Sequence, residues 1–549
     1  MICKRGPTAH VLSSVPRLTM IFAILIVLAA PAQLDGRGQT SDASGPLFLP
    51  VVAYDPGAPN TIAVAIADVN GDRKPDLVVT NRCAETNCAS SSVGVLLGGV
   101  DGTFHPVMIY GQVGSSAVAL AVADVNNDGK PDVAVANFLA STVTIVLGNG
   151  DGTFRPGATY DSGGIFAHTV NFADVNGDGK ADMLVGNGAG NFANGNPTTR
   201  TVSVLLGNGD GSFQPGIAYD SGASDLSSVA VTDVNRDKVP DLIVASRCGG
   251  GNCANQGSVA VLLGNGDGTL QDPVTYSSGG YVTGSVAVAD VNGDGVLDAT
   301  VANCTSIGPP PGVGSATCPN GDGVIGVLLG NGDGTFQSAR TYDSGGEGAS
   351  SLVVADFNGD FKADVAVLTN IQSKTLALLL GKGDGTFQLP TAYNSGGLFS
   401  AWIAVGDLNG DRRPDLAVAN ESRSVGVLLN KAAPRDVTPP MILLPAFPRI
   451  LWPPTRKLVP VMVFGTITDA GSGVNLRTAT YAVKDEYGEV QPKGHISLDN
   501  AGNYRFTVLL QASRRFADLN GRQYMITVRA KDNAGNAASK TGAIIVPHG

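Results

Sequence analysis

A nine-residue acidic loop recurs through this sequence, and it carries the residue types that bind hard cations. In the clearest copy, residues 174–182, the sequence is Asp-Val-Asn-Gly-Asp-Gly-Lys-Ala-Asp. Side-chain oxygens fall at positions 1, 3, 5 and 9, a backbone carbonyl is available at position 7, and glycines at positions 4 and 6 permit a tight turn. Because alternate residues of such a turn point inward, the spacing predicts that the loop wraps one hard cation.

Seven copies share this pattern, with Asp at positions 1, 5 and 9 and Asn at position 3; they are called the acidic loops below. Copy by copy, these residues are Asp68, Asn70, Asp72 and Asp76; Asp124, Asn126, Asp128 and Asp132; Asp174, Asn176, Asp178 and Asp182; Asp233, Asn235, Asp237 and Asp241; Asp290, Asn292, Asp294 and Asp298; Asp356, Asn358, Asp360 and Asp364; and Asp407, Asn409, Asp411 and Asp415. The copy that starts at Asp233 has Arg236 and Lys238 at positions 4 and 6, so we expect it to be the weakest cation site.

The sequence argues against an EF-hand, whose twelve-residue loop ends in Glu and lies between two helices. Position 12 is valine in all seven copies: Val79, Val135, Val185, Val244, Val301, Val367 and Val418. Each of these valines lies in a short apolar run rich in β-branched residues, and a similar run precedes each loop. The acidic loops are therefore predicted to join β-strands.

Composition favours a turn-rich all-β protein. The chain has 549 residues, 73 of them glycine, and 43% of its residues are hydrophobic. The formal net charge is −11, and the acidic loops contain 21 of the 47 Asp and Glu residues, where bound cations would neutralise them. An acidic chain of this kind argues against a nucleic-acid partner, which requires a basic face.

Residues 1–32 have the pattern of a secretory signal peptide. Lys4, Arg5 and Arg17 precede an apolar run over 18–30, and Ala30-Pro31-Ala32 forms a small-x-small cleavage pattern. An uncleaved anchor is the alternative, but the run is shorter than the roughly 20 residues that span a bilayer. We expect the mature chain to be secreted or at the extracellular surface, with no transmembrane segment.

Cysteine usage agrees with an oxidising compartment. Apart from Cys3, the six cysteines form three local pairs, each at the same place in the repeat: Cys83 and Cys88, Cys248 and Cys253, and Cys304 and Cys318. Local pairing is favoured over the other connectivities that six cysteines permit. A structural zinc site is the rival interpretation, and it would require thiolates from different repeats to converge.

Four predicted strands per repeat point to a closed ring. Successive acidic loops begin 56, 50, 59, 57, 66 and 51 residues apart, a spacing typical of propeller blades. The last repeat lacks a fourth strand, and residues 48–54 match the fourth strands at 213–219 and 387–393. Pairing the two ends would close the ring and remove a sheet edge. We predict a seven-bladed β-propeller over 46–430, after a linker at 33–45.

The repeat resembles the FG-GAP or VCBS repeat of integrin-α-type propellers, on the residues Asp-Val-Asn-Gly-Asp-Gly-Lys-Pro/Ala-Asp followed by Leu-Leu-Gly-Asn-Gly-Asp-Gly-Thr-Phe. The resemblance covers about residues 45–430. It implies that the loop between the first two strands of a blade binds calcium. Carried over, it makes the residues at positions 1, 3, 5 and 9 of each acidic loop the calcium ligands.

A second domain is predicted after a linker at 431–440. Residues 441–549 contain alternating patterns at 458–468, 479–483, 504–510, 524–530 and 543–546, which suit a β-sandwich. Residues 524–536 resemble the late strands of bacterial Ig-like and cadherin-like domains. Asp532 could be a calcium ligand, but a turn residue is the preferred interpretation.

No catalytic constellation stands out among five scattered histidines, and His168 is interpreted as a core or rim residue. The sequence therefore predicts a non-catalytic binding or adhesion module for an extracellular glycan or protein. Two alternatives stay open. One is a lectin in which Trp402 or the tyrosines that end the fourth strands stack on sugars, and the other is a polysaccharide-degrading enzyme by analogy of fold.

Overall fold

The computed structural model describes residues 46–83, 90–111, 113–188, 200–222, 225–247, 256–305, 322–369, 376–431, 438–469, 473–489, 491–499, 501–532 and 536–547. Every regular element in these residues is a β-strand, which confirms the all-β class. The chain divides into two compact units, whose described residues are 46–431 and 438–547. The predicted signal peptide at 1–32, the linker at 33–45 and residues 432–437 lie outside the described residues.

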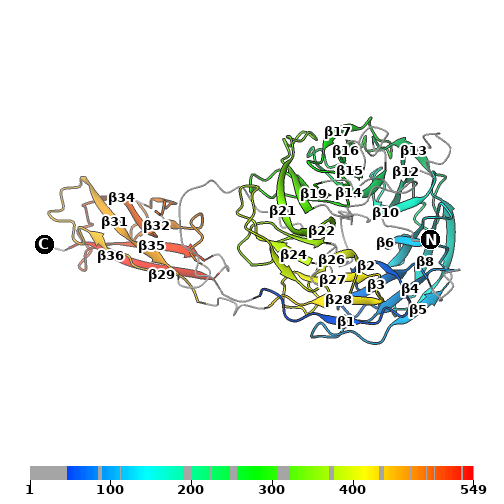
Figure 1. Ribbon diagram of the computed structural model, residues 1–549. Coiled ribbons are helices and arrows are strands. Elements are labelled where there is room, and N and C mark those ends of the chain that lie inside the picture. The colour runs from blue at the N-terminus through cyan, green and yellow to red at the C-terminus, as the bar shows by residue number, and fades with distance from the viewer. Residues whose placement is uncertain are drawn as a thin grey trace. The chain divides into compact units, whose positions relative to one another are not determined.

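The first unit is built from repeated four-stranded antiparallel sheets, and its described residues form seven of them (Figure 1). Six sheets use four consecutive strands, which are β2 (Thr61–Ala67), β3 (Asp76–Asn81), β4 (Ser92–Leu96) and β5 (Met108–Gly111); β6 (Ala117–Ala123), β7 (Asp132–Asn137), β8 (Thr142–Gly148) and β9 (Phe154–Asp161); β10 (Ala167–Ala173), β11 (Asp182–Asn187), β12 (Thr201–Leu205) and β13 (Ile217–Asp220); β14 (Leu226–Thr232), β15 (Asp241–Ser246), β16 (Ser258–Leu262) and β17 (Val274–Ser277); β18 (Val286–Ala289), β19 (Asp298–Cys304), β20 (Asp322–Leu328) and β21 (Arg340–Glu347); and β22 (Ala349–Ala355), β23 (Asp364–Thr369), β24 (Leu376–Leu379) and β25 (Thr391–Tyr393).

The seventh sheet joins the two ends of the repeat region. Its strands are β26 (Ser400–Gly406), β27 (Asp415–Asn420), β28 (Ser424–Leu428) and β1 (Val52–Tyr54). Val52 lies opposite Val427, and Phe48 forms a further bridge with Asn430. The predicted pairing of the N-terminal strand with the last repeat is therefore confirmed. First strands of neighbouring sheets contact one another in a closed cycle, from β2 through β6, β10, β14, β18, β22 and β26 back to β2.

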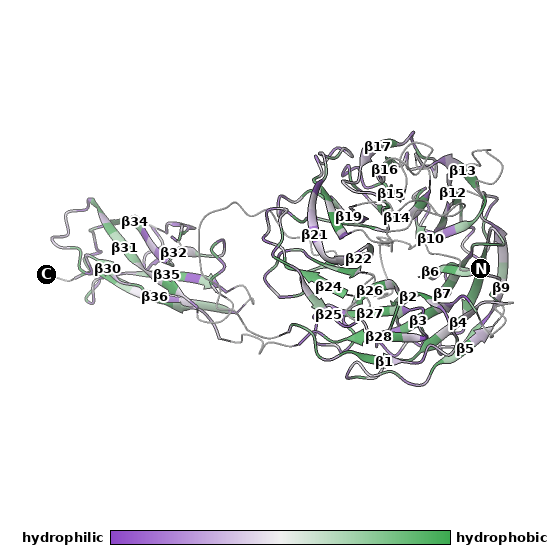
Figure 2. Ribbon diagram, viewed as in Figure 1, coloured by the Kyte–Doolittle hydropathy of each residue, from purple (hydrophilic) through white to green (hydrophobic). Residues whose placement is uncertain are grey.

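The sequence of each repeat explains which strands are buried. The second strands are buried along their whole length, as in β7 with its sequence Asp-Val-Ala-Val-Ala-Asn, because sheets pack on both of their faces. The fourth strands are largely exposed, as in β13. Figure 2 shows the corresponding change from hydrophobic inner strands such as β26 and β27 to more polar outer ones such as β9.

Aromatic pairs join neighbouring sheets at six of the seven junctions. The tyrosine at the end of a fourth strand meets a phenylalanine of the next sheet edge to face, with centroids 5.2–5.9 Å apart and interplanar angles of 79–86°. The pairs are Tyr54–Phe104, Tyr110–Phe154, Tyr160–Phe213, Tyr276–Phe336, Tyr342–Phe387 and Tyr393–Phe48. Each such pair contributes about 0.5–1.5 kcal/mol beyond its burial.

These tyrosines therefore belong to the packing between sheets, which favours a role in the core of the blades over stacking on sugars. Trp402 on β26 is also only 3% exposed and belongs to the hydrophobic core cluster that includes residues of β2, β3, β4 and β27. Aromatic side chains are more often used for core packing than for stacking on a ligand, because burial of their large area is so favourable.

The fourth strands are shorter than predicted. The expected strands at 213–219 and 387–393 begin only at Ile217 and Thr391. Phe213 and Phe387 instead form isolated bridges with Gly207 and Gly381. Pro215 and Pro390 lie between each bridge and its strand and have no N–H to donate to a neighbouring strand, although β9 continues through Pro156 at the place that corresponds to Pro215.

The second unit consists of two four-stranded sheets that share one hydrophobic core. One sheet contains β29 (Met441–Ile442), β30 (Ala446–Phe447), β31 (Leu458–Thr468) and β34 (Asn503–Gln511), and the other contains β32 (Thr480–Asp485), β33 (Lys493–His495), β35 (Arg522–Lys531) and β36 (Ala537–Val546). The five predicted strands are found, the one at 458–468 with the predicted ends and the other four with shifted ends, and β29, β30 and β33 were not predicted. Val461, Val508 and Ile526 are buried and alternate with more exposed residues along their strands, as expected for sheets with one solvated face.

Candidate metal centres

The acidic loops occupy the same place in all seven sheets, between the first and second strands. Each connection is eight residues long, and its ninth position is the first residue of the second strand. Positions 4 and 6 have positive φ angles between 56° and 84° in every copy. Glycine adopts this conformation freely, whereas Arg236 and Lys238 adopt it at φ 67° and 72° with a cost of about 1–2 kcal/mol each.

The loop conformation is held by hydrogen bonds from backbone N–H groups to the acidic side chains. In the first copy, the N–H of Arg73 donates to Asp68 Oδ2 at 2.7 Å, and the N–H of Asp72 donates to Asn70 Oδ1 at 2.9 Å. The N–H of Lys74 donates to Asp72 Oδ1 at 2.9 Å. The equivalent three bonds recur in the other six copies. These bonds bring the oxygens of positions 1, 3 and 5 into one short turn.

The aspartate at position 9 differs from the other three because it is fully buried in every copy. In Asp182, Oδ2 accepts the N–H of Val175 at 2.9 Å and Oδ1 accepts the N–H of Gly207 at 2.8 Å. Val175 is position 2 of the loop, and Gly207 follows the third strand. The same two bonds recur in the other copies, so this side chain ties the loop to two strands of its sheet.

The hydrogen bonds to these seven buried carboxylates do not fully offset the cost of removing their negative charge from water. Burial raises the pKa of Asp76, Asp132, Asp182 and Asp241 to about 6, of Asp298 and Asp415 to about 7, and of Asp364 to about 8. The backbone N–H donors lower these pKa values, and the neighbouring carboxylates at positions 1 and 5 raise them again. Negative charges held together in this way favour a bound cation.

The chemistry of the residues fits calcium, since the donors are carboxylate, amide and carbonyl oxygens only. Two observations limit that fit. In three loops the lysine at position 7 pairs with the carboxylate at position 5, as between Lys74 and Asp72 at 2.9 Å. Within the described parts of the chain, no three His, Cys, Asp or Glu side chains are placed so that they could hold a metal ion. Calcium binding at positions 1, 3, 5 and 9 therefore stays a prediction.

A buried asparagine that the sequence analysis did not single out connects neighbouring sheets. It lies at or next to the end of the second strand, and in four copies its Nδ2 donates to a carbonyl 25 residues earlier, in the connection from the preceding sheet. In Asn187 the acceptor is Ser162 O at 3.2 Å. The sequence does contain a signal for this residue. Counted from the first Asp of each acidic loop, position 14 is asparagine in five of the seven copies.

The predicted disulfides fall partly outside the described residues. Cys83 and Cys304 are each disulfide-bonded. The predicted partners Cys88 and Cys318, and both members of the pair Cys248 and Cys253, lie outside the described residues. Asp532 accepts the N–H of Asn536, four residues later, at 2.7 Å, which agrees with its interpretation as a turn residue.

His168 on β10 is the one predicted core or rim histidine, and it is only 3% exposed. Its ring meets that of Phe138 edge to face at 5.8 Å. Burial holds the pKa of His168 well below its usual value of 6.5, and the positive charges of Arg247 and Arg82 lower it further. The histidine therefore lies in the core as a neutral side chain.

We expect the lowered pKa of His168 to subtract from the stability of the first unit in mild acid, whereas the raised pKa values of the seven buried aspartates act in the opposite direction. Below about pH 6.5 the unfolded chain gains a proton that the folded chain excludes, so stability falls by up to about 1.4 kcal/mol per pH unit from this group. Unfolding in urea at pH 7.5 and pH 5.0 is compared for the unaltered chain and for His168→Gln, because the contribution of the aspartates is common to both. The variant should be the more stable of the two at pH 5.0 relative to pH 7.5, and equal changes in the two proteins would contradict the prediction.

Comparison with protein-family models identifies the repeats. FG-GAP-like repeats match residues 68–135, 124–185, 252–301, 315–367 and 356–418, and an FG-GAP repeat matches residues 166–205. All five FG-GAP-like matches end at the valine of position 12 of an acidic loop. The chain thus carries FG-GAP repeats, and the repeated four-stranded sheets agree with a propeller of integrin-like type.

Proteins with FG-GAP-repeat propellers are typically non-catalytic and often extracellular. No curated protein matches the sequence. Across the described residues, no helix has the length and apolar character needed to cross a membrane.

Proposed function

We propose that the chain is a secreted, non-catalytic binding protein. Its first unit is a seven-bladed β-propeller stabilised by calcium in the acidic loops, and its second unit is an Ig-like β-sandwich. The propeller presents connections between its strands to an extracellular glycan or protein. The FG-GAP repeats and the closed cycle of first strands support the scaffold.

The observation that supports binding is the contrast between the two ends of the sheets. The acidic loops are all eight residues long, whereas the connections between second and third strands range from 3 to 17 residues. Because consecutive strands are antiparallel, these connections lie at the end opposite the acidic loops, called the variable end below. A constant scaffold end and a variable end are typical of proteins that bind through loops on a rigid framework.

Exposed apolar side chains occur at the variable end within the described residues. Leu139, in the connection between β7 and β8, is 61% exposed. Leu398 and Phe399, which directly precede β26, are 52% and 61% exposed. Apolar and aromatic side chains of this kind are enriched at the centre of binding interfaces. They are the contact residues that we propose for the partner.

The test begins with the mature chain in calcium, applied to a glycan array and to extracellular proteins of the source cells. For the partner so identified, Leu139→Ser and Phe399→Ser should each weaken binding by about tenfold or more. Val100→Ser is the matched control, because Val100 is 78% exposed in the turn between β4 and β5, at the end of the acidic loops. If only the control variant lost binding, the contact would lie at the end of the acidic loops and not at the variable end, which would contradict the proposal.

A folded sample that binds neither glycan nor protein would overturn the proposed function. The same sugar should also be recovered intact after incubation with the protein. Release of new reducing ends or unsaturated products would instead establish the polysaccharide-degrading enzyme that the sequence left open.

A further inference from the structure

One end of the second unit exposes large apolar side chains on two neighbouring loops. The first tip loop, residues 449–457, carries Trp452 with 57% of its surface exposed. The second tip loop, residues 512–521, carries Phe516 and Leu519, which are 95% and 81% exposed. Two backbone hydrogen bonds join the loops, from Arg456 N–H to Ala512 O at 2.8 Å and from Ala512 N–H to Lys457 O at 2.9 Å. The two loops therefore form one surface, called the tip surface below.

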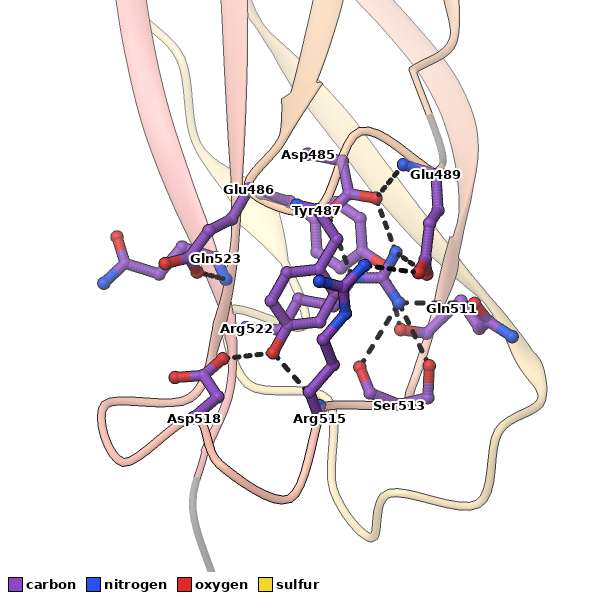
Figure 3. A network of polar contacts seen from close by, with 11 residues as sticks. Asp485, Glu486, Tyr487, Glu489, Gln511, Ser513, Arg515, Asp518, Arg522 and Gln523 are labelled. Atoms are coloured by element: carbon purple, nitrogen blue, oxygen red, sulfur yellow. Dashed lines mark hydrogen bonds and ion pairs between the residues drawn. The ribbon is translucent and has the colours of Figure 1, made fainter.

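The second tip loop is held in place by a polar network at its base (Figure 3). The ring of Tyr487 lies between two guanidinium groups, with Arg515 at 4.6 Å and Arg522 at 4.7 Å from its centroid. The hydroxyl of Tyr487 donates to Asp518 and accepts the N–H of Arg515 at 3.1 Å. Because both ends of the segment 515–518 are fixed in this way, Phe516 is held out in solvent instead of folding back onto the sheet.

Positive charge surrounds these apolar side chains. Five cationic residues lie on the two tip loops: Arg449, Arg456, Lys457, Arg514 and Arg515. Among the residues that the structure describes, only Arg515 of these five forms an ion pair, with Glu489 at 3.3 Å.

The carboxylates at the same end have partners within the unit. Asp485 and Glu489 pair with Arg522, Asp518 accepts the hydroxyl of Tyr487, and Glu486 accepts the N–H of Gln523 at 3.0 Å. Residues 438–547 contain 13 Lys and Arg against 7 Asp and Glu, a net charge of +6 in a chain whose total is −11. The protein as a whole is acidic, but its second unit is basic, and the tip surface is a cationic end of that unit.

We propose that the tip surface attaches the protein to an anionic lipid membrane. Protruding aromatic and aliphatic side chains enter the interface of a bilayer, and flanking Arg and Lys side chains remain at the level of the phosphates. A soluble polyanion would use the cations but would give Phe516 and Leu519 no role. The protein then lies at a membrane surface, and the attachment is independent of the binding proposed for the first unit.

The test measures co-sedimentation of the mature chain, at fixed calcium concentration, with two kinds of vesicle. Vesicles of phosphatidylcholine and phosphatidylglycerol in equal parts should bind the protein, and vesicles of phosphatidylcholine alone should bind it at least about tenfold more weakly. The double variant Phe516→Ser/Leu519→Ser should lose at least about tenfold in affinity for the anionic vesicles. Its fold is checked by the melting transition of the second unit, which exposed side chains should not alter.

Two further variants make the result specific. Arg456→Gln/Lys457→Gln should also weaken binding, with a larger effect at low salt than at high salt. Leu389→Ser is the matched control, because Leu389 is 89% exposed in the first unit, and it should bind like the unaltered chain. Absence of vesicle binding would overturn the proposal. If the charge variant lost binding but the Phe516/Leu519 variant did not, the surface would be a site for soluble polyanions, and the proposal would be overturned. Binding of a protein instead of lipid through Phe516 would overturn it as well.

Discussion

Removing calcium with EDTA is expected to lower the melting temperature of the first unit by on the order of 10 °C. The buried carboxylates at position 9, the half-buried ones at position 1 and the exposed ones at position 5 repel one another unless a cation lies among them. At about 1 mM calcium, and with extracellular-type dissociation constants of roughly 10⁻⁴–10⁻³ M, each loop contributes about 0.4–1.4 kcal/mol. Seven loops together then contribute on the order of 3–10 kcal/mol.

Differential scanning calorimetry would measure this effect with an internal control. The second unit contains no acidic loop, so its own transition should not move in EDTA. Adding calcium back should restore the first transition, and magnesium should restore less because it requires a tighter octahedral set of ligands. An unchanged first transition in EDTA would show that the loops are stabilised by their hydrogen bonds alone.

Replacing Arg522 with methionine is expected to destabilise the second unit by roughly 3–5 kcal/mol. Arg522 and Asp485 are both fully buried, and Arg522 Nε lies 2.9 Å from Asp485 Oδ1. The guanidinium also packs between the rings of Tyr487 and Tyr524, at 4.7 and 4.9 Å. The substitution preserves apolar volume but leaves the charge of Asp485 buried without its main partner.

Urea unfolding, followed by the signal of the second unit, would measure the loss. The double variant Arg522→Met/Asp485→Asn should be more stable than Arg522→Met alone, because no uncompensated charge is then left in the core. If the double variant were the less stable of the two, packing of the guanidinium rather than its charge would be the larger effect. The transition of the first unit serves as the control and should not change.

The sequence by itself determined the architecture of the first unit. The period of the acidic loops and the valine at position 12 predicted strands on both sides of each loop, and the structure has β-strands there in all seven copies. The unmatched strand near Tyr54 predicted the pairing with the last repeat. These features depend on local spacing and on the need to pair every sheet edge, both of which can be counted along a chain.

Only the tertiary structure separated the roles of residues that look alike in the sequence. Asp178 and Asp182 are equivalent as candidate ligands, yet Asp178 lies near the surface of its loop while Asp182 is buried and binds two backbone N–H groups from different segments. The second of these segments, at Gly207, is 25 residues away. Burial and long-range hydrogen bonds depend on which segments meet in space, and local spacing carries no information about that.

The second unit shows the same limit more strongly. Its alternating pattern predicted five strands, but Tyr487, Arg515 and Arg522 are ordinary loop or strand residues until the fold stacks them. The exposure of Phe516 likewise follows from how its loop is anchored, and an apolar residue in a sequence is otherwise expected to be buried. The sequence shows which residues are apolar and therefore favour burial, and the tertiary structure decides which of them remain exposed to solvent.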